Sequence, residues 1–307
     1  MSERLRGVVA AITTPFFEAG PPDFDRFLDR AAFLLNAGCD GLNVLGTTGE
    51  ATSMSTQQRL DVMRALGVSA LPCDRMLVGT GAAAVEDAAT LTRAAAEIGF
   101  CGALLLPPFY YKPVPDAGVL RFVDALAEAT AGRPIPFYLY NYPALSGIAY
   151  TPALVSALVR NFGDRIAGLK DSSGDLTYAR EIAAISPALD VFPSNEGALL
   201  LARSGGPFAG CISATVNLNS ADCARAYHQG DEAALARAVA LRAIFDGLPL
   251  VPAVKALVGQ VTGDAEHART LPPLVPLGAD EAALLSRRYS ELETSGSPSR
   301  QAVGVAS

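Results

Sequence analysis

One lysine of this chain stands where a buried segment should end. Lys170 directly follows the apolar run Ile166-Ala167-Gly168-Leu169. Burial disfavours the ammonium form and lowers the pKa of a lysine, which leaves an amine able to attack a carbonyl carbon. Lys170 is therefore a candidate for covalent catalysis through a Schiff base. The alternative is a solvent-exposed lysine paired with Asp171 or Asp175, and position alone weights the two about equally.

Lysine is rare in this sequence, which makes each one informative. The chain has 24 basic residues, and only Lys112, Lys170 and Lys255 among them are lysine. Arginine thus serves wherever a generic surface cation is sufficient. Because lysine can lose its proton on burial and arginine effectively cannot, each of the three lysines needs its own explanation.

Two further segments carry groups that could assist an amine. Tyr140 ends the apolar segment 137–140, where its hydroxyl could move a proton or, the favoured role for an isolated tyrosine, satisfy a backbone carbonyl. The segment Gly46-Thr47-Thr48-Gly49-Glu50 offers two hydroxyls and several N–H groups ahead of a helix, which suits a carboxylate. An ordinary strand-to-helix turn explains the segment equally well.

Gly79-Thr80-Gly81 imitates a dinucleotide-binding loop. However, it follows the third strand rather than the first, and no acidic residue ends the next strand to bind a ribose.

Short apolar runs alternate with segments of helical period along most of the chain. Eight strands, each followed by a helix, predict parallel strands with right-handed crossovers and hence a (β/α)8 TIM barrel. A doubly wound open sheet is the alternative, because periodicity does not separate the two. The predicted strands are Val8–Thr13, Gly41–Leu45, Met76–Gly79, Ala103–Leu106, Pro136–Tyr140, Ile166–Leu169, Asp190–Phe192 and Gly210–Ala214. The predicted helices are Asp23–Asn36, Thr56–Leu71, Val85–Ile98, Asp116–Thr130, Pro152–Asn161, Leu176–Ile185, Gly197–Arg203 and Ser220–His228.

The pattern changes to helix alone after His228. We assign residues 1–229 to the barrel and residues 230–293 to a C-terminal extension of the same domain. Residues 294–307 are rich in small and polar types and are predicted to form a loose tail. The helices of the extension are predicted at Asp231–Phe245, Pro252–Val261 and Asp280–Glu293.

Composition argues against several classes of partner. The net charge of −7 and the absence of a basic cluster disfavour nucleic acid and anionic membranes. The sequence contains neither a signal peptide pattern nor an apolar run long enough to span a bilayer, so we expect a cytoplasmic protein. Five dispersed cysteines without a Cys-x-x-Cys pair, and only two histidines, disfavour a metal site or a disulfide framework. We expect no cofactor.

Three motifs in this order, each at a predicted strand end, resemble one family. They are Gly46-Thr47-Thr48-Gly49-Glu50, Tyr140-Asn141-Tyr142-Pro143-Ala144-Leu145-Ser146-Gly147 and Gly168-Leu169-Lys170-Asp171-Ser172. This set resembles the N-acetylneuraminate lyase and dihydrodipicolinate synthase superfamily of Schiff-base-forming aldolases. The resemblance implies a TIM barrel that acts on pyruvate or another 2-oxo acid, and a homotetramer built as a dimer of dimers.

The resemblance also implies a role for each matching residue. Lys170 matches the lysine that forms the imine, and Tyr140 matches the tyrosine that relays protons. Thr47 and Thr48 match the hydroxyl pair that helps to hold the substrate carboxylate and orients this tyrosine, a task we expect of Thr48. Tyr110 matches a tyrosine that reaches into a neighbouring subunit's site. Predicted substrate-binding residues are Gly46, Thr47, Leu145, Ser172, Asn195, Glu196, Ser213 and Ala214.

Departures from the family pattern bear on the substrate. Dihydrodipicolinate synthases carry an arginine where this chain has Leu145, and the sialic acid lyases carry a serine that we align with Ala214. We therefore expect the preferred substrate to be a neutral-tailed 2-oxo acid, or a small polyol aldehyde plus pyruvate, with Asn195 and Glu196 binding hydroxyls. Dihydrodipicolinate synthesis would require an arginine from elsewhere in the chain. Two further candidates are a dehydratase acting on a 2-oxo-3-deoxy sugar acid and a non-catalytic 2-oxo acid binding protein.

Overall fold

Eight parallel strands form a barrel in which each strand lies beside its sequence neighbour, as predicted. The computed structural model describes residues 4–203 and 205–296. The strand order follows the chain from β1 to β7, and β8 pairs with β1, unlike the order in a doubly wound sheet. Ala209, just before β8, donates its N–H to the carbonyl of Val191 in β7 at 2.9 Å, which continues the ring. The strands are β1 (Gly7–Ala11), β2 (Gly41–Val44), β3 (Met76–Gly79), β4 (Gly102–Leu105), β5 (Phe137–Asn141), β6 (Ile166–Asp171), β7 (Asp190–Pro193) and β8 (Gly210–Ser213).

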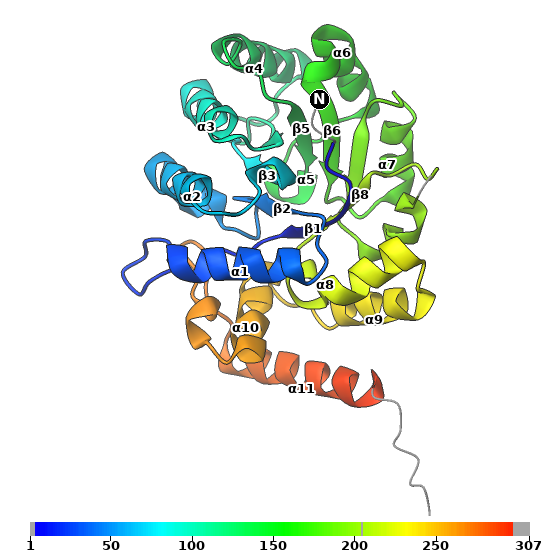
Figure 1. Cartoon of the computed structure of the whole chain (residues 1–307). Coiled ribbons are helices and arrows are strands. Elements are labelled where there is room, and N and C mark those ends of the chain that lie inside the picture. The colour runs from blue at the N-terminus through cyan, green and yellow to red at the C-terminus, as the bar shows by residue number, and fades with distance from the viewer. Residues whose placement is uncertain (1–3, 204, 297–307) are drawn as a thin grey trace, which may run out of the picture.

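Helices surround the strands on the outside of the barrel (Figure 1). Local signals set several of their ends. The side chains of Ser55 and Gln58 form a capping box that starts α2, and Gly99 in the left-handed region ends α3. The barrel helices are α1 (Phe24–Asn36), α2 (Thr56–Val68), α3 (Val85–Ile98), α4 (Asp116–Ala129), α6 (Pro152–Phe162), α7 (Leu176–Ala183) and α8 (Val216–Ala224).

Two of the predicted helices differ from the structure. The helix predicted at Gly197–Arg203 is replaced by two 3₁₀ turns, η4 (Glu196–Ala198) and η5 (Leu200–Ala202). A Cβ on Gly206 would lie 1.8 Å from the carbonyl oxygen of Leu201, so the chain folds back tightly and ends the segment there. The helix predicted at 220–228 begins earlier, with α8, and finishes as a π-helix over Arg225–Gln229. A four-residue helix, α5 (Pro143–Ser146), follows β5.

The strand side chains alternate between two environments. In β1, Val8 and Ala10 belong to the layer between the strands and the helices, whereas Val9 and Ala11 belong to the barrel interior. This alternation follows from the twofold period of a strand. Large side chains fill the interior, so it is a packed core rather than a pore. They include Leu77, Leu104, Tyr138, Tyr140, Phe192 and Ile212.

A β-bulge interrupts the pairing of β5 with β6. Phe137 pairs with Ile166, but Tyr138 pairs with Gly168, so one residue of β6 is unmatched. Beyond the bulge, Tyr140 pairs with Lys170. Directly paired residues of parallel strands point to the same face, and Tyr140 faces the barrel interior. An uninterrupted register would instead pair Lys170 with Asn141 on the opposite face.

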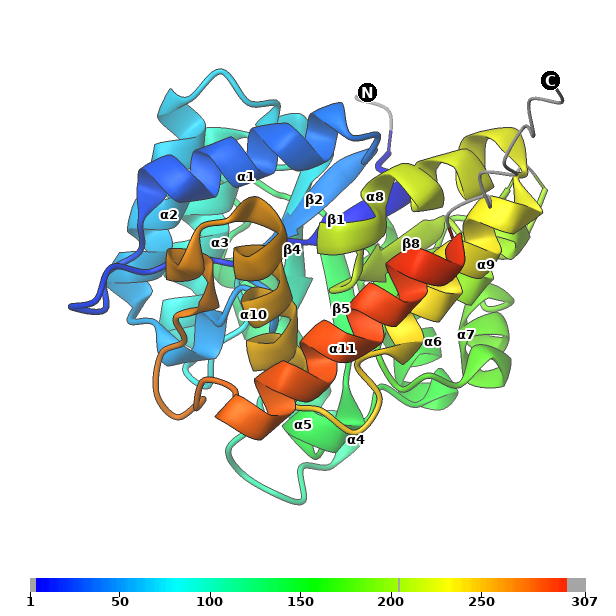
Figure 2. The same cartoon turned by 90° about the horizontal axis from the view of Figure 1, so that it is seen from below.

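The C-terminal helices gather on one side of the barrel (Figures 1 and 2). They are α9 (Glu232–Ala243), α10 (Leu250–Thr262) and α11 (Ala279–Gly296). Helix α10 packs against α8 and α11, and α11 packs against α9. The predicted tail begins too early, because α11 continues to Gly296, and residues 297–307 lie outside the described part. Across the described ranges, no helix is long and apolar enough to cross a membrane.

Candidate active site

A cavity of about 340 Å³ opens where the strands end at their carboxyl side. The loops after parallel barrel strands build the binding sites of this fold. Several of the predicted site residues line the cavity together, although they come from strands far apart in the sequence. Among its lining residues are Thr47, Thr48, Tyr140, Leu145, Lys170 and Ser172.

Lys170 is buried in this cavity and has no ionic partner. It is only 3% exposed, and no residue of the described chain forms a hydrogen bond or salt bridge with its amine. Asp171 turns away and accepts hydrogen bonds from Asn141 and Ser173, while Asp175 caps the first turn of α7. The alternative of an exposed lysine paired with either aspartate is therefore wrong.

The environment of Lys170 favours a neutral amine. Burial lowers the pKa of Lys170 to about 7, because the surroundings do not replace the water that would solvate an ammonium ion. A substantial fraction of the side chain is therefore uncharged at neutral pH. The neutral form is the nucleophilic one.

Tyr140 lies next to this amine. The Lys170 Nζ atom is 4.5 Å from the centre of the Tyr140 ring. The Tyr140 hydroxyl lies 3.0 Å from the Thr47 hydroxyl. Burial raises the pKa of Tyr140, and hydrogen bonds with Thr47 and Ser172 oppose part of that rise. Tyr140 is thus a protonated phenol connected to a second hydroxyl, an arrangement suited to proton transfer.

The contact with Tyr140 that we predicted for Thr48 is made by Thr47. Thr47, rather than Thr48, contacts the Tyr140 hydroxyl, while Thr48 lines the cavity without a hydrogen bond to that tyrosine. The backbone N–H groups of both threonines have no hydrogen-bond partner in the described chain. Gly46 lies beside them and lines a smaller cavity of about 20 Å³ together with Thr47 and Tyr140.

A buried ion pair between Lys255 and Glu50 holds the turn that contains Thr47 and Thr48. The fully buried Lys255 of α10 forms an ion pair with Glu50 and donates to the Thr14 carbonyl at 2.8 Å. The other oxygen of Glu50 accepts the Leu271 N–H at 2.7 Å. Burial raises the pKa of Glu50, and Lys255 opposes the rise. Lys255 therefore holds the threonine turn in place, which accounts for the second of the three lysines.

We expect Lys255→Met to destabilise the protein strongly. The variant leaves the carboxylate of Glu50 buried without its cation, which typically costs about 3–5 kcal/mol. Urea denaturation should show this loss, whereas Lys112→Met, at an exposed position, should change the free energy of unfolding by less than about 0.5 kcal/mol. Adding Glu50→Gln to Lys255→Met should recover part of the loss. A single Lys255 variant as stable as the wild type would contradict the anchoring role.

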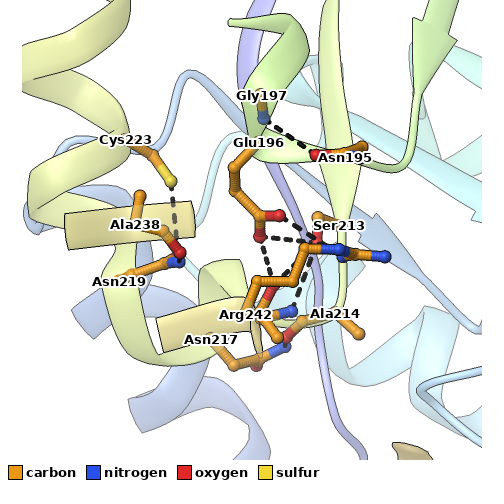
Figure 3. A network of polar contacts seen from close by, with 11 residues as sticks. Asn195, Glu196, Gly197, Ser213, Ala214, Asn217, Asn219, Cys223, Ala238 and Arg242 are labelled. Carbon is orange, nitrogen blue, oxygen red and sulfur yellow. Dashed lines mark hydrogen bonds and ion pairs between the residues drawn. The ribbon is translucent and has the colours of Figure 1, made fainter. Parts of the chain in front are cut away.

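The remaining predicted residues separate into three groups. Leu145, Ser172 and Ala214 line the cavity with Lys170. Asn195, Glu196 and Ser213 lie behind its wall, where Asn195 accepts the Gly197 N–H and Glu196 is fully buried (Figure 3). Tyr110 lies outside the cavity, is 75% exposed and packs edge-on against Tyr111, so its role in a neighbouring subunit stays a prediction.

Arg242 of α9 is the functional candidate that the sequence did not reveal. Its side chain lines the same cavity as Lys170 and Leu145. The resemblance implies an arginine at the position of Leu145, and we expected that dihydrodipicolinate synthesis would require an arginine from elsewhere in the chain. Arg242 brings such a guanidinium to the cavity wall. In the sequence, Arg242 is only a basic residue on a predicted helix after the barrel. Helical period alone does not show which face of that helix borders the site.

Gly79 and Gly81 have a structural explanation. A Cβ on Gly79 would lie 1.9 Å from the Leu45 carbonyl oxygen, so the close approach of β3 to β2 requires glycine. The carbonyls of both glycines accept hydrogen bonds from the buried Arg59 of α2. The resemblance to a dinucleotide-binding loop thus comes from packing.

The fold and this cavity define a (β/α)8 barrel with a small-molecule site at the carboxyl ends of its strands. Residues 4–290 match the Dihydrodipicolinate synthetase family, and the chain belongs to that family. It is 33% identical over 302 residues to a DapA-like lyase of Chloroflexus aurantiacus, covering 95% of this chain and 99% of the relative. It is 31% identical to 4-hydroxy-tetrahydrodipicolinate synthase of Methanococcoides burtonii, with 94% of this chain and 98% of the relative covered.

Solved structures give the same picture of the fold. Dihydrodipicolinate synthase of Agrobacterium tumefaciens superposes with a TM-score of 0.86 at 27% identity, covering 93% of this chain and 99% of that chain. A variant of 2-keto-3-deoxygluconate aldolase of Sulfolobus solfataricus superposes with a TM-score of 0.81 at 20% identity, covering 94% and 97%. The second comparison supports the fold alone.

Proposed function

We infer that this chain is a Schiff-base-forming lyase or aldolase that breaks or makes a carbon–carbon bond between pyruvate and an aldehyde. The observation that carries this inference is the buried, unpaired amine of Lys170 beside Tyr140 in a family of lyases and aldolases. Burying a lysine without a partner costs free energy. A catalytic role for the amine explains why this costly arrangement is present.

The first chemical step joins Lys170 to the substrate. The Nζ atom adds to the ketone carbon of the 2-oxo acid, and the ketone oxygen leaves as water once it has received protons. That oxygen receives one proton from the amine nitrogen and one from Tyr140, and the Thr47 hydroxyl, 3.0 Å from the Tyr140 hydroxyl, stabilises the phenolate that remains by donating a hydrogen bond. The product is a protonated imine between Lys170 and the 2-oxo acid. The unpartnered N–H groups of Thr47 and Thr48 suit the acid's own carboxylate.

The second step breaks or forms the carbon–carbon bond. In cleavage, the electrons of the broken bond move into the protonated imine, which becomes an enamine. Tyr140, which has already given up its proton, accepts the proton of the hydroxyl that becomes the aldehyde. Protonation of the enamine and addition of water then release pyruvate and restore Lys170. Condensation is the reverse sequence.

Three candidate reactions differ in the molecule that reacts through the imine. A 2-oxo-3-deoxy sugar acid could be cleaved, or a dehydratase could remove water from such an acid through the same imine. Dihydrodipicolinate synthesis is the third candidate, supported by the names of curated relatives and by a guanidinium in the cavity. Retention of Lys170, Tyr140 and Thr47 in one cavity argues against a non-catalytic 2-oxo acid binding protein.

We further propose a cytoplasmic homotetramer in which Tyr110 contacts a neighbouring subunit.

Reductive trapping tests the proposed function directly. We expect that incubation with pyruvate followed by borohydride adds one pyruvate-derived group to each chain, because borohydride reduces an imine to a stable amine. Peptide mapping by mass spectrometry should locate the group on Lys170. The exposed Lys112 and the ion-paired Lys255 are internal controls. Modification of either control instead of Lys170, or of no lysine, would overturn the mechanism.

A further inference from the structure

We propose that Arg242 selects the second substrate by binding a carboxylate at the end distant from the reacting carbonyl. The proposal rests on the function inferred above, because it concerns the molecule that meets the 2-oxo acid in the same cavity. Arg242 is thus a specificity-determining residue contributed by the C-terminal extension. Three observations carry the proposal: its surroundings, its fixed orientation and its unused donors.

The surroundings of Arg242 strengthen its interaction with an anion. Its side chain is 32% exposed and borders the cavity that contains Lys170. Much of the neighbouring wall is apolar, and electrostatic attraction is stronger there than in water. The apolar lining residues include Leu145, Ile212, Ala214, Leu250, Val251 and Pro252.

The orientation of Arg242 is fixed by groups behind the wall. Its Nη1 atom donates to Glu196 Oε2 at 3.3 Å and to Ser213 Oγ at 3.2 Å. Glu196 is fully buried, and its other oxygen accepts hydrogen bonds from the hydroxyls of Ser213 and Thr215. Figure 3 shows the Arg242 side chain beside Ser213 and Glu196, with its contacts to both marked.

This arrangement changes the role that we predicted for Glu196. The carboxylate is 0% exposed and already accepts protein hydrogen bonds, so it is not available to bind substrate hydroxyls. Its ion pair with Arg242 also means that it does not repel an incoming anion as an unpaired carboxylate would. Glu196 is therefore a positioning residue that holds the arginine from behind.

The donors that remain on Arg242 match a carboxylate. No residue of the described chain accepts a hydrogen bond from Nε or Nη2 of Arg242. These two atoms form one edge of the guanidinium group and present two parallel N–H bonds, the geometry that recognises a carboxylate in bidentate fashion. A polyol tail offers no charge to this edge. A phosphate dianion would be poorly balanced, because Glu196 already offsets part of the single positive charge.

The first test measures binding at this position without turnover. Wild-type enzyme is treated with pyruvate and borohydride so that a reduced adduct occupies Lys170, and butyrate, butyramide and propyl phosphate are then titrated by ligand-observed NMR. We expect butyrate to bind about tenfold or more tightly than butyramide, as a charge-assisted pair should. Arg242→Met should abolish this difference, and Arg242→Lys should retain part of it because the charge remains but the fork is lost.

The second test measures selectivity during turnover. With pyruvate as the first substrate, kcat/KM is compared for succinate semialdehyde and its neutral amide, 4-oxobutanamide. We expect Arg242→Met to lower kcat/KM about 100-fold for the acid and much less for the amide. Arg237→Met is the matched control, because Arg237 lies on the same helix, pairs with Asp222 and is absent from the cavity wall. It should match the wild type for both aldehydes.

The outcomes separate this proposal from the function on which it rests. If no adduct forms on wild-type Lys170, the proposed function fails and this proposal falls with it. If the adduct forms but butyrate and butyramide bind equally, or propyl phosphate binds more tightly, only the carboxylate proposal is overturned. If Arg242→Met no longer forms the pyruvate adduct, Arg242 holds the first substrate, and the assignment to the second is wrong.

Discussion

Replacing Lys170 with methionine should abolish turnover and yet stabilise the fold. We expect kcat to fall by at least about 10³-fold, because no other group on the cavity wall can form the imine. With a pKa of about 7 in the folded protein, against an ordinary lysine value near 10.5, the buried amine costs roughly 4 kcal/mol of stability at pH 7. Methionine is of similar length and needs no solvation, so urea denaturation should show a more stable variant.

The sign of this stability effect depends on pH. A lysine with a lowered folded-state pKa destabilises the protein most at pH values below that pKa, and its penalty disappears as the pH approaches the unfolded value of about 10.5. The gain in Lys170→Met should therefore shrink as the pH rises from 7 to 10. A variant that is less stable than the wild type at pH 7, or that keeps its activity, would contradict an unpaired catalytic amine.

Wild-type kinetics should report the same group. Because the neutral amine is the nucleophile, kcat/KM should rise with pH through about 7 and then level off, in the range to which burial moves the pKa of Lys170. A rise centred near pH 10 would indicate a solvated lysine. A profile that falls through pH 7 would indicate that the ammonium form is the active one.

Tyr140→Phe should reduce kcat by about 10²- to 10⁴-fold, the usual contribution of a general acid–base group. The substitution removes one hydroxyl and little packing, so KM and the free energy of unfolding should change much less than kcat. Trapping with borohydride should still label Lys170, more slowly, because the amine is retained. Near-normal kcat would leave Tyr140 with a purely structural role.

Two comparisons show whether that loss belongs to the proton relay. Tyr138→Phe is the matched control, because Tyr138 lies on the same strand, is buried in the same interior and has a hydroxyl that forms no hydrogen bond in the described chain. It should retain wild-type kcat. Thr47→Val should cost about tenfold in kcat, and Thr48→Val less, because of these two threonines it is Thr47 that contacts the Tyr140 hydroxyl. Equal effects of the two threonine variants would contradict this geometry.

The sequence alone predicted parallel strands, with a barrel favoured over an open sheet, and much of the site; the pairing of β8 with β1 decided for the barrel. Eight apolar runs separated by helical segments require parallel strands with crossovers, and such strands bring their carboxyl ends to one rim. Lys170, Tyr140 and the Thr47–Thr48 turn each follow or end a predicted strand, so their meeting was predictable without any tertiary detail. Helix ends with a local cause were equally predictable, as Ser55 and Gln58 illustrate.

Only the tertiary structure decided on which face Lys170 lies and what else enters the cavity. The bulge in β6 shifts the register by one residue and thereby turns Lys170 inward beside Tyr140. Arg242 is 46 residues from Glu196 in sequence, and their pairing depends on how α9 packs over the turn after β7. Register and helix packing arise from contacts between distant segments, whereas periodicity reports only local preference. The sequence therefore predicted Lys170 as a nucleophilic amine, but it did not predict which polar groups line the cavity around that amine.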